Sequence, residues 1–219
     1  MTSKIRERIG KVSLVFISIV IGVLIVELTV KMFNIGVNIN INWESHPILG
    51  WSQTPNGQYD YEPIAGTKVH VEFNSQGFRD VEHPVEKPPG VKRIVLIGDS
   101  FSESAQVNMA DTFYRQLENF LNVSGQEKWE IINLGVGDFG TAQQWLALTE
   151  IGLKYSPDLV LHQIFPLNDI CNNSIDLYGL CSSKNDLYRP YFVESGGKLQ
   201  LTTKQPVRNF LRHHLVSYG

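Results

Sequence analysis

Three short polar stretches carry the side chains that could do chemistry. Ser100 follows Gly98 and Asp99 and offers a hydroxyl nucleophile, while Asn168 lies in a later stretch and offers an amide donor. Between them lies a glycine-rich stretch, 133–141, whose backbone N–H groups are further donors. A hydroxyl with N–H donors for a tetrahedral oxyanion is what acyl transfer through a serine requires. The alternative for Ser100 is an ordinary turn with a serine at the start of a helix.

Each polar stretch follows an apolar segment with the pattern of a buried strand. The first segment, 93–97, holds a row of apolar, mostly β-branched residues, and the other two are 129–134 and 159–165. Helices are predicted between the strands, over 111–121 and 141–155. Strands that alternate with single helices predict a parallel sheet with right-handed crossovers. Because chemistry in such sheets lies beyond the carboxyl ends of the strands, the three polar stretches are expected to meet at one edge.

The helical periodicity also predicts which side chains face the core. A strand is expected over 68–73, a small hairpin from 191–193 and 199–201, and an amphipathic helix from Arg208 onward. Three parallel strands are few for an open sheet, so the α/β domain is expected to lack its C-terminal part. The predicted core-facing residues are Phe113, Leu117, Phe120 and Leu121 in the first helix, and Ala142, Trp145, Leu146, Leu148 and Leu153 in the second.

Residues 1–33 have the pattern of a membrane anchor. A basic segment, 1–11, precedes an apolar segment, 12–33, and about 20 mostly apolar residues suffice to span a bilayer. The basic flank predicts a cytoplasmic N-terminus, with an extracytoplasmic collar and linker over 34–90 and the α/β domain over 91–219. A cleaved signal peptide is the alternative, although no small-x-small cleavage site follows the apolar segment.

Charge bears on the class of binding partner, and cysteine content bears on disulfide and metal binding. The chain carries a net charge of −3 and its first eleven residues carry +3, which leaves −6 for the remainder. An acidic remainder argues against nucleic acid as a partner. The two cysteines, Cys171 and Cys181, could pair in an oxidising compartment or remain free. No metal-ligand spacing surrounds them, so no metal or cofactor is expected.

The three polar stretches, in this order, resemble the conserved blocks of the SGNH (GDSL) hydrolase superfamily. Gly98-Asp99-Ser100-Phe101 is similar to the first block, 133–141 to the second and Leu167-Asn168-Asp169 to the third, and 74–79 resembles membrane-anchored bacterial members. The resemblance implies a flavodoxin-like, three-layer α/β/α fold. It also implies hydrolysis of esters or thioesters, or O-acyl transfer, with Ser100 as nucleophile. The implied oxyanion hole comprises the N–H of Ser100, a backbone N–H of the second block and the Asn168 side chain.

The sequence departs from this family at the second block. Many members have a glycine five positions after the block's first asparagine, but this chain has Asp138 there and Gly137 one position earlier. A backbone N–H does not require glycine, so the N–H of either residue is a candidate oxyanion donor. A carboxylate close to an oxyanion is unfavourable unless it points away.

The general base is the second departure. The family's fourth block, Asp-x-x-His, follows the other three, but nothing after Asn168 matches it. The segment 80–83 has the spacing but precedes Ser100, and we expect it to be a surface coincidence. His162 is predicted to be a core histidine with a satisfied ring nitrogen, and His213 and His214 begin the last predicted helix. Loss of the base typically costs about 10⁴-fold or more in rate, so the 219-residue chain is expected to be impaired.

The sequence therefore favours a serine-dependent hydrolase of small-molecule or glycan esters, held at the membrane by its N-terminal helix. An O-acyltransferase of cell-surface glycans and a non-catalytic, membrane-tethered binding module are the alternatives. A third alternative is a dinucleotide site, because 135–140 has the pattern Gly-x-Gly-x-x-Gly. That pattern follows the second strand rather than the first, and the acidic residue at the matching distance, Asp158, begins a strand instead of ending one.

Overall fold

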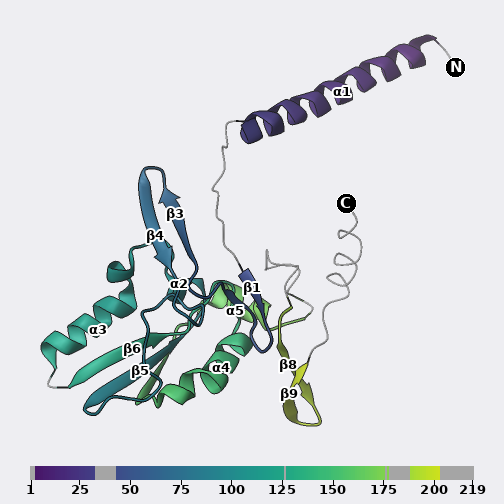
Figure 1. Ribbon diagram of the computed structural model, residues 1–219. Helices are drawn as coiled ribbons and strands as arrows, with labels where there is room; N and C mark the ends of the chain where they lie inside the picture. The colour runs from purple at the N-terminus through teal and green to yellow at the C-terminus, as the bar shows by residue number, and fades with distance from the viewer. Residues whose placement is uncertain (1–2, 33–42, 126, 176, 178–187, 203–219) are drawn as a thin grey trace. The chain divides into compact units, whose positions relative to one another are not determined.

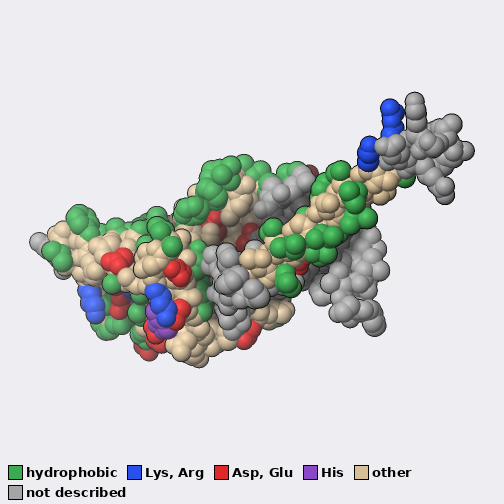
Figure 2. Space-filling view, turned by 90° about the horizontal axis from the view of Figure 1, so that it is seen from above, with side chains coloured by type: hydrophobic (Ala, Val, Ile, Leu, Met, Phe, Trp, Pro, Cys, Tyr) green, Lys and Arg blue, Asp and Glu red, His purple; other side chains and the backbone are tan. Residues whose placement is uncertain are grey.

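The computed structural model describes residues 3–32, 43–125, 127–175, 177 and 188–202. The chain divides into two compact units, 1–38 and 39–219, and each is described by itself. The first unit is one helix, α1 (Ser3–Met32), shown in purple in Figure 1. Within it, Arg8–Thr29 is long and apolar enough to cross a membrane, a property shared with signal sequences. Apolar side chains run along its exposed surface in Figure 2.

The second unit contains a parallel sheet of three strands. These are β5 (Val91–Ile97), β6 (Lys128–Asn133) and β7 (Leu159–His162), in the order β6-β5-β7. Both outer strands pair with β5 in parallel, and Val95 lies opposite Ile132 on one side and Val160 on the other. The three predicted strands and their parallel pairing are confirmed, so the fold is mixed α/β.

Helices cover the two faces of the sheet (Figure 1). On one face α3 (Phe113–Ser124) packs Tyr114 against Ile94, Leu96 and Ile131. On the other face α4 (Thr141–Glu150) contributes to a second apolar cluster, and the 3₁₀ helix η2 (Gly152–Tyr155) follows it. A 3₁₀ helix at Met109–Asp111, η1, precedes α3. The second apolar cluster includes Val95, Ile97, Ile132, Leu134, Leu146, Ala147 and Leu148.

The predicted core faces of both helices are partly wrong. In α3, Phe113 and Phe120 are exposed, and the buried side is formed by Tyr114 together with Leu117 and Leu121. These three residues have the spacing i, i+3 and i+7, which also lies along one helical face. In α4, Trp145 is exposed, and in η2 Leu153 is exposed as well, because the α-helix ends before it. Polar residues Gln143 and Gln144 are buried in α4 instead.

The region before the sheet adds two hairpins to the same unit. They are β1 (Trp43–His46) with β2 (Gly50–Gln53), and β3 (Gln58–Ile64) with β4 (Thr67–Glu72), so the strand predicted at 68–73 is confirmed. The first hairpin places Trp51 in the apolar cluster that contains α4. The segment that was expected to form a collar therefore supplies part of the core of the α/β unit.

Two short helices and a last hairpin complete the described chain. Helix α2 (Ser100–Glu103) follows β5, and helix α5 (Pro166–Asn172) follows β7. The predicted hairpin is confirmed as β8 (Tyr191–Ser195) and β9 (Lys198–Thr202). The helix predicted from Arg208 lies outside the described residues. Cys171 is disulfide-bonded, while Cys181, the other cysteine of the chain, also lies outside them.

Candidate active site

Ser100 begins a helix immediately after the central strand. Asp99 is fully buried and caps α2 by accepting a 3.0 Å hydrogen bond from the N–H of Phe101. The side chain of Ser100 is partly exposed, and its hydroxyl makes no hydrogen bond to any residue for which the structure gives a position. Its backbone N–H stands at the first helical position, where a helix supplies no partner of its own. Ser100 thus offers both a hydroxyl and an N–H at the carboxyl edge of the sheet.

The turn before Ser100 leaves no room for a side chain. A Cβ atom on Gly98 would lie 2.2 Å from the Ser102 hydroxyl and 2.6 Å from Oε1 of Gln163. That same oxygen accepts hydrogen bonds from the N–H of Asp99, at 3.2 Å, and from the Ser102 hydroxyl, at 3.1 Å. Gln163 therefore connects the end of β7 to the turn that carries Ser100, and Gly98 permits the close approach.

Arg79 fixes the other end of α2. Its guanidinium is buried and donates to the carbonyl oxygens of Glu103 at 3.2 Å, of Ser104, and of Val107 at 2.5 Å. A cation at the carbonyl end of a helix satisfies groups that the helix leaves unpaired. The segment 74–79, which resembles the family on sequence, thus has a local physical role in holding the helix that begins at Ser100.

Asn168 lies beside the Ser100 turn. Its amide nitrogen Nδ2 donates a 2.8 Å hydrogen bond to Oδ2 of Asp99, the residue before Ser100. Phe101 follows Ser100 directly and Phe165 stands three positions before Asn168. The centroids of these two rings lie 4.7 Å apart. Nδ2 carries two hydrogens, so one remains for another acceptor. The structure therefore brings the first and third polar stretches together.

Gly137 lies close to the same helix, but its N–H is already engaged. It donates to Oε2 of Glu103 at 2.5 Å, and Nε2 of Gln53 donates to Oε1 of the same carboxylate at 3.0 Å. Glu103 is buried, with 4 % of its surface exposed. The second polar stretch thus joins the first, although in this arrangement a carboxylate and not a substrate oxygen accepts the Gly137 N–H.

Asp138 adopts a backbone conformation that favours glycine. Its φ is +64°, in the left-handed region that glycine adopts without strain and that aspartate tolerates better than most residues. Nδ2 of Asn172 donates to its carbonyl oxygen at 3.2 Å and to Oδ1 at 3.1 Å. Nη2 of Arg189 donates to the same carbonyl at 2.8 Å and to Oδ2 at 3.1 Å. The carboxylate of Asp138 therefore has an amide and a guanidinium among its partners.

The glycine-rich turn is filled by the protein itself. The N–H of Gly135 donates to Oδ1 of Asn133 at 3.0 Å, and the N–H of Gly140 donates to Oε1 of Gln143 at 3.3 Å. With Gly137 bonded to Glu103, all three glycine N–H groups have internal acceptors. A phosphate-binding turn instead points its N–H groups toward the ligand. The geometry therefore does not favour the dinucleotide alternative.

The prediction that the Asp-x-x-His match at 80–83 lies on the surface is wrong for its two motif residues, Asp80 and His83, although Val81 and Glu82 between them are exposed. Asp80 is buried and its Oδ2 accepts a 2.7 Å hydrogen bond from the N–H of Asn133 at the end of β6. The side chain of His83 is only 7 % exposed, with Nε2 3.4 Å from the same Asp80 oxygen. Burial lowers the pKa of His83. Asp80 anchors the end of β6, and neither Asp80 nor His83 is hydrogen-bonded to Ser100.

His162 differs from the core histidine that the sequence predicts. It is exposed, so that part of the prediction is wrong, but its Nε2 lies 2.6 Å from Oε1 of Gln144, which gives the ring nitrogen a partner. Nε2 of Gln144 in turn donates to Oδ1 of Asp169 at 3.0 Å, and burial raises the pKa of Asp169. His213 and His214 lie outside the described residues.

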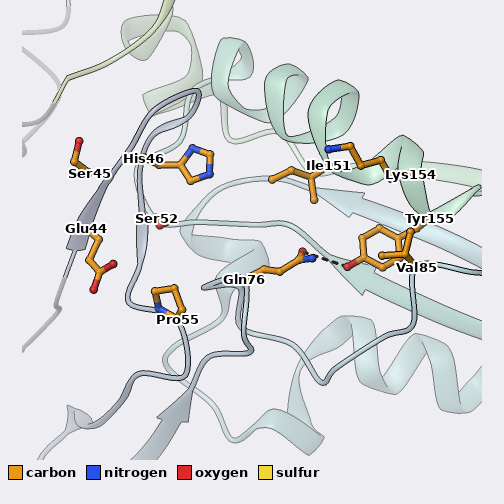
Figure 3. A pocket seen from close by; sticks show the side chains of 10 residues that line it. All are labelled: Glu44, Ser45, His46, Ser52, Pro55, Gln76, Val85, Ile151, Lys154 and Tyr155. Carbon is orange, nitrogen blue, oxygen red and sulfur yellow. Dashed lines mark hydrogen bonds between the residues drawn. The ribbon is translucent and has the colours of Figure 1, made fainter.

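A pocket of about 370 Å³ opens elsewhere on the same unit (Figure 3). Nδ1 of His46 accepts the N–H groups of Ile48 and Leu49, and burial lowers the pKa of this histidine. The Tyr155 hydroxyl donates to Oε1 of Gln76 at 3.2 Å. The lining residues include none of the predicted site residues. They are Glu44, Ser45, His46, Ser52, Pro55, Gln76, Val85, Ile151, Lys154 and Tyr155.

Sequence reasoning missed the residues that support the site. Glu103 stands three positions after Ser100, a spacing that places both on one side of a helix and could have drawn attention to it. Arg189 is distant in sequence and no local pattern announces it. Over the ranges that the structure describes, no group of three or more His, Cys, Asp or Glu side chains could hold a metal ion.

Comparison with known proteins finds no matching family model, and no curated protein matches the chain.

Proposed function

We propose that the α/β unit is a serine-dependent hydrolase of ester bonds, with a flavodoxin-like arrangement of sheet and helices and Ser100 as its nucleophile. The observation that carries this proposal is the 2.8 Å hydrogen bond between Nδ2 of Asn168 and Oδ2 of Asp99. It ties the amide of the third polar stretch to the turn that presents the hydroxyl. A nucleophile and an amide donor at one sheet edge are the main parts of an acyl-transfer site.

In the proposed reaction the Ser100 oxygen attacks the ester carbonyl, its proton passes to solvent, and the bond to the alkoxy oxygen breaks to release the alcohol. Water then hydrolyses the acyl-serine, which releases the carboxylic acid and restores the Ser100 hydroxyl. The oxyanion of each tetrahedral intermediate accepts hydrogen bonds from the N–H of Ser100 and the second N–H of Asn168. For the third donor we propose the N–H of Asp138, because the N–H of Gly137 is bonded to Glu103. Its left-handed φ falls at the position where many members of the SGNH superfamily, which the sequence resembles, have glycine.

Among the described residues, no side chain is hydrogen-bonded to the Ser100 hydroxyl as a base that could accept its proton. Activation of a serine by a base contributes several orders of magnitude, so the expected rates are low. Esters with a good leaving group depend least on such assistance, because departure of the alcohol needs no proton. An activated aryl ester is therefore the suitable substrate for a first test.

The test measures p-nitrophenol release from p-nitrophenyl acetate by the wild-type chain and by Ser100→Ala. We expect the alanine variant to lose the release above the solvent background. Ser75→Ala is the control, because Ser75 is an exposed turn serine bonded to Glu82 and lies outside the proposed site. Equal rates in the wild type and in Ser100→Ala would remove Ser100 as the nucleophile.

A non-catalytic binding module is the second candidate, and one observation favours it. The N–H of Gly137 is satisfied by Glu103, and no described histidine is hydrogen-bonded to Ser100. A site that had lost its chemistry would show both features. This candidate predicts no difference between the wild type and Ser100→Ala in the ester assay.

We further propose that α1 anchors the unit to the membrane and leaves it on the extracytoplasmic side. The support is the length and apolar character of Arg8–Thr29. Extraction of membranes with alkaline carbonate tests the anchor: an integral helix stays with the lipid. Release of a shortened chain, with a new N-terminus beyond the apolar segment, would identify a cleaved signal peptide instead.

A further inference from the structure

Arg189 is a fully buried cation near the candidate site. Its side chain is fully buried, and its guanidinium carbon lies 4.7 Å from the centre of the Trp51 ring. Nη1 donates to Oε1 of Gln143 at 2.7 Å, and Nη2 donates to the carbonyl and carboxylate of Asp138. A buried charge with this many partners is costly to replace, so the contact is well defined. Arg189 therefore connects the chain just before β8 to the second polar stretch.

The contact matters because of the charge that Asp138 places at the site. The proposed oxyanion would lie next to the backbone of this residue, so a carboxylate without a counter-charge would oppose the negative charge that forms. At a separation of about 6 Å and an effective dielectric constant of about 20, two like charges repel enough to slow a reaction about 100-fold. A glycine at this position would raise no such repulsion.

We propose that Arg189 is a positioning residue of this site, which offsets the Asp138 carboxylate and holds the left-handed turn so that the Asp138 N–H faces the developing oxyanion. This inference rests on the proposed hydrolase function. It pairs the aspartate at 138 with a buried arginine that neutralises its charge. Arg189 touches no reacting atom and acts only through Asp138.

The test is a rescue experiment with the full chain. The rate of p-nitrophenol release from p-nitrophenyl acetate is measured for the wild type, Ser100→Ala, Arg189→Met, Asp138→Asn and the double variant Arg189→Met/Asp138→Asn. Methionine keeps an apolar stem over Trp51 but removes the charge. We expect Arg189→Met to lower the Ser100-dependent rate about 100-fold. Adding Asp138→Asn should recover at least tenfold of that loss, because the uncompensated charge is then gone.

A purely structural role predicts a different pattern. Asparagine at 138 does not restore the contacts of Arg189 with Gln143 and Trp51, so the double variant would then be as slow as Arg189→Met. Circular dichroism and urea unfolding of each variant show whether it is folded. If Arg189→Met does not fold, Arg189→Lys and Arg189→Gln replace it, and lysine should exceed glutamine at least tenfold because only lysine keeps the charge.

The outcomes separate this proposal from the function on which it rests. A wild-type rate equal to that of Ser100→Ala overturns the hydrolase function, and the role of Arg189 in that reaction with it. A Ser100-dependent rate that Arg189→Met leaves unchanged, or that Asp138→Asn fails to rescue, overturns the role of Arg189 alone. Equal Ser100-dependent rates in Arg189→Lys and Arg189→Gln would likewise overturn the role of Arg189 alone.

Discussion

The strands β6 and β7 both pair with β5 in parallel, yet their surroundings differ. Ile132 in β6 is 3 % exposed, whereas Val160 in β7 is 37 % exposed, although both lie opposite Val95. The turn after β6 is enclosed by side chains such as Trp51 and Arg189. The helix after β7 has an outer face with exposed apolar residues, among them Leu167 and Ile170.

This difference shows that the two halves of the candidate site are held by different forces. On the β6 side, apolar burial and internal hydrogen bonds act together on Gly137 and Asp138. On the β7 side, hydrogen bonds of Asn168 and Asp169 position α5 while much of its apolar surface stays in contact with solvent. Substitutions on the β6 side should therefore cost more stability than equivalent substitutions on the β7 side.

The largest expected difference comes from truncating the two neighbours of Val95. Ile132→Ala should lower the free energy of unfolding by about 2–5 kcal/mol, because it leaves a cavity in the buried cluster. Val160→Ala should lower it by less than about 1 kcal/mol, because that side chain is partly solvated already. Urea unfolding measures both. Similar losses in the two variants would mean that β7 is as well covered as β6.

A second pair of variants compares a buried asparagine with an exposed one. The Asn133 amide donates to the carbonyl oxygens of Arg79 and Ser102, and its Oδ1 accepts the N–H of Gly135. Asn133→Ala should cost about 2–3 kcal/mol of unfolding free energy, because buried backbone groups lose their partners. Asn122→Ala, which frees exposed backbone groups of Trp129 for hydration, should cost about 1 kcal/mol or less. Equal losses of unfolding free energy in Asn133→Ala and Asn122→Ala, measured in urea, would contradict this expectation.

Asn168→Ala probes the β7 side of the site. Its loss removes one hydrogen bond to Asp99, so the cost in stability should be about 1 kcal/mol. The Ser100-dependent rate of ester cleavage should fall about 10²–10³-fold, as for removal of one oxyanion donor. Asn173→Ala is the control, because its Oδ1 accepts only the exposed N–H of Ala142. A normal rate in Asn168→Ala would exclude this amide from the oxyanion hole.

The smallest expected effect is the pH dependence of stability that comes from His83, which lies beside Asp80. Burial lowers the pKa of His83 below its ordinary value of 6.5, so the unfolded chain takes up this proton first as the pH falls. The stability from the neutral ring is complete above pH 6.5 and declines below it. Between pH 7.5 and 5.5, wild type should lose more unfolding free energy than His83→Gln. An identical pH dependence in both proteins would show that His83 does not titrate in this range.

The sequence predicts the strands well because each is a compact apolar run, as in Ile94 to Ile97, bounded by turn residues. It predicts helix faces less well, since 113-117-120-121 and 114-117-121 are both helical patterns and only packing against Ile131 selects the second. The convergence of Asn168 with the Ser100 turn could be expected from parallel topology. The contacts of Arg79 and Arg189 with the site could not, because each joins segments that are distant in sequence.

The most direct test of the account is a crystal structure of the protein after reaction with a fluorophosphonate ester, which phosphonylates an activated serine. The account predicts phosphorus bonded to the Ser100 oxygen, and a phosphonyl oxygen within hydrogen-bond distance of Nδ2 of Asn168 and the backbone N of Asp138. An unmodified Ser100, or an adduct whose oxygen points away from both nitrogens, would contradict the proposed nucleophile and oxyanion hole.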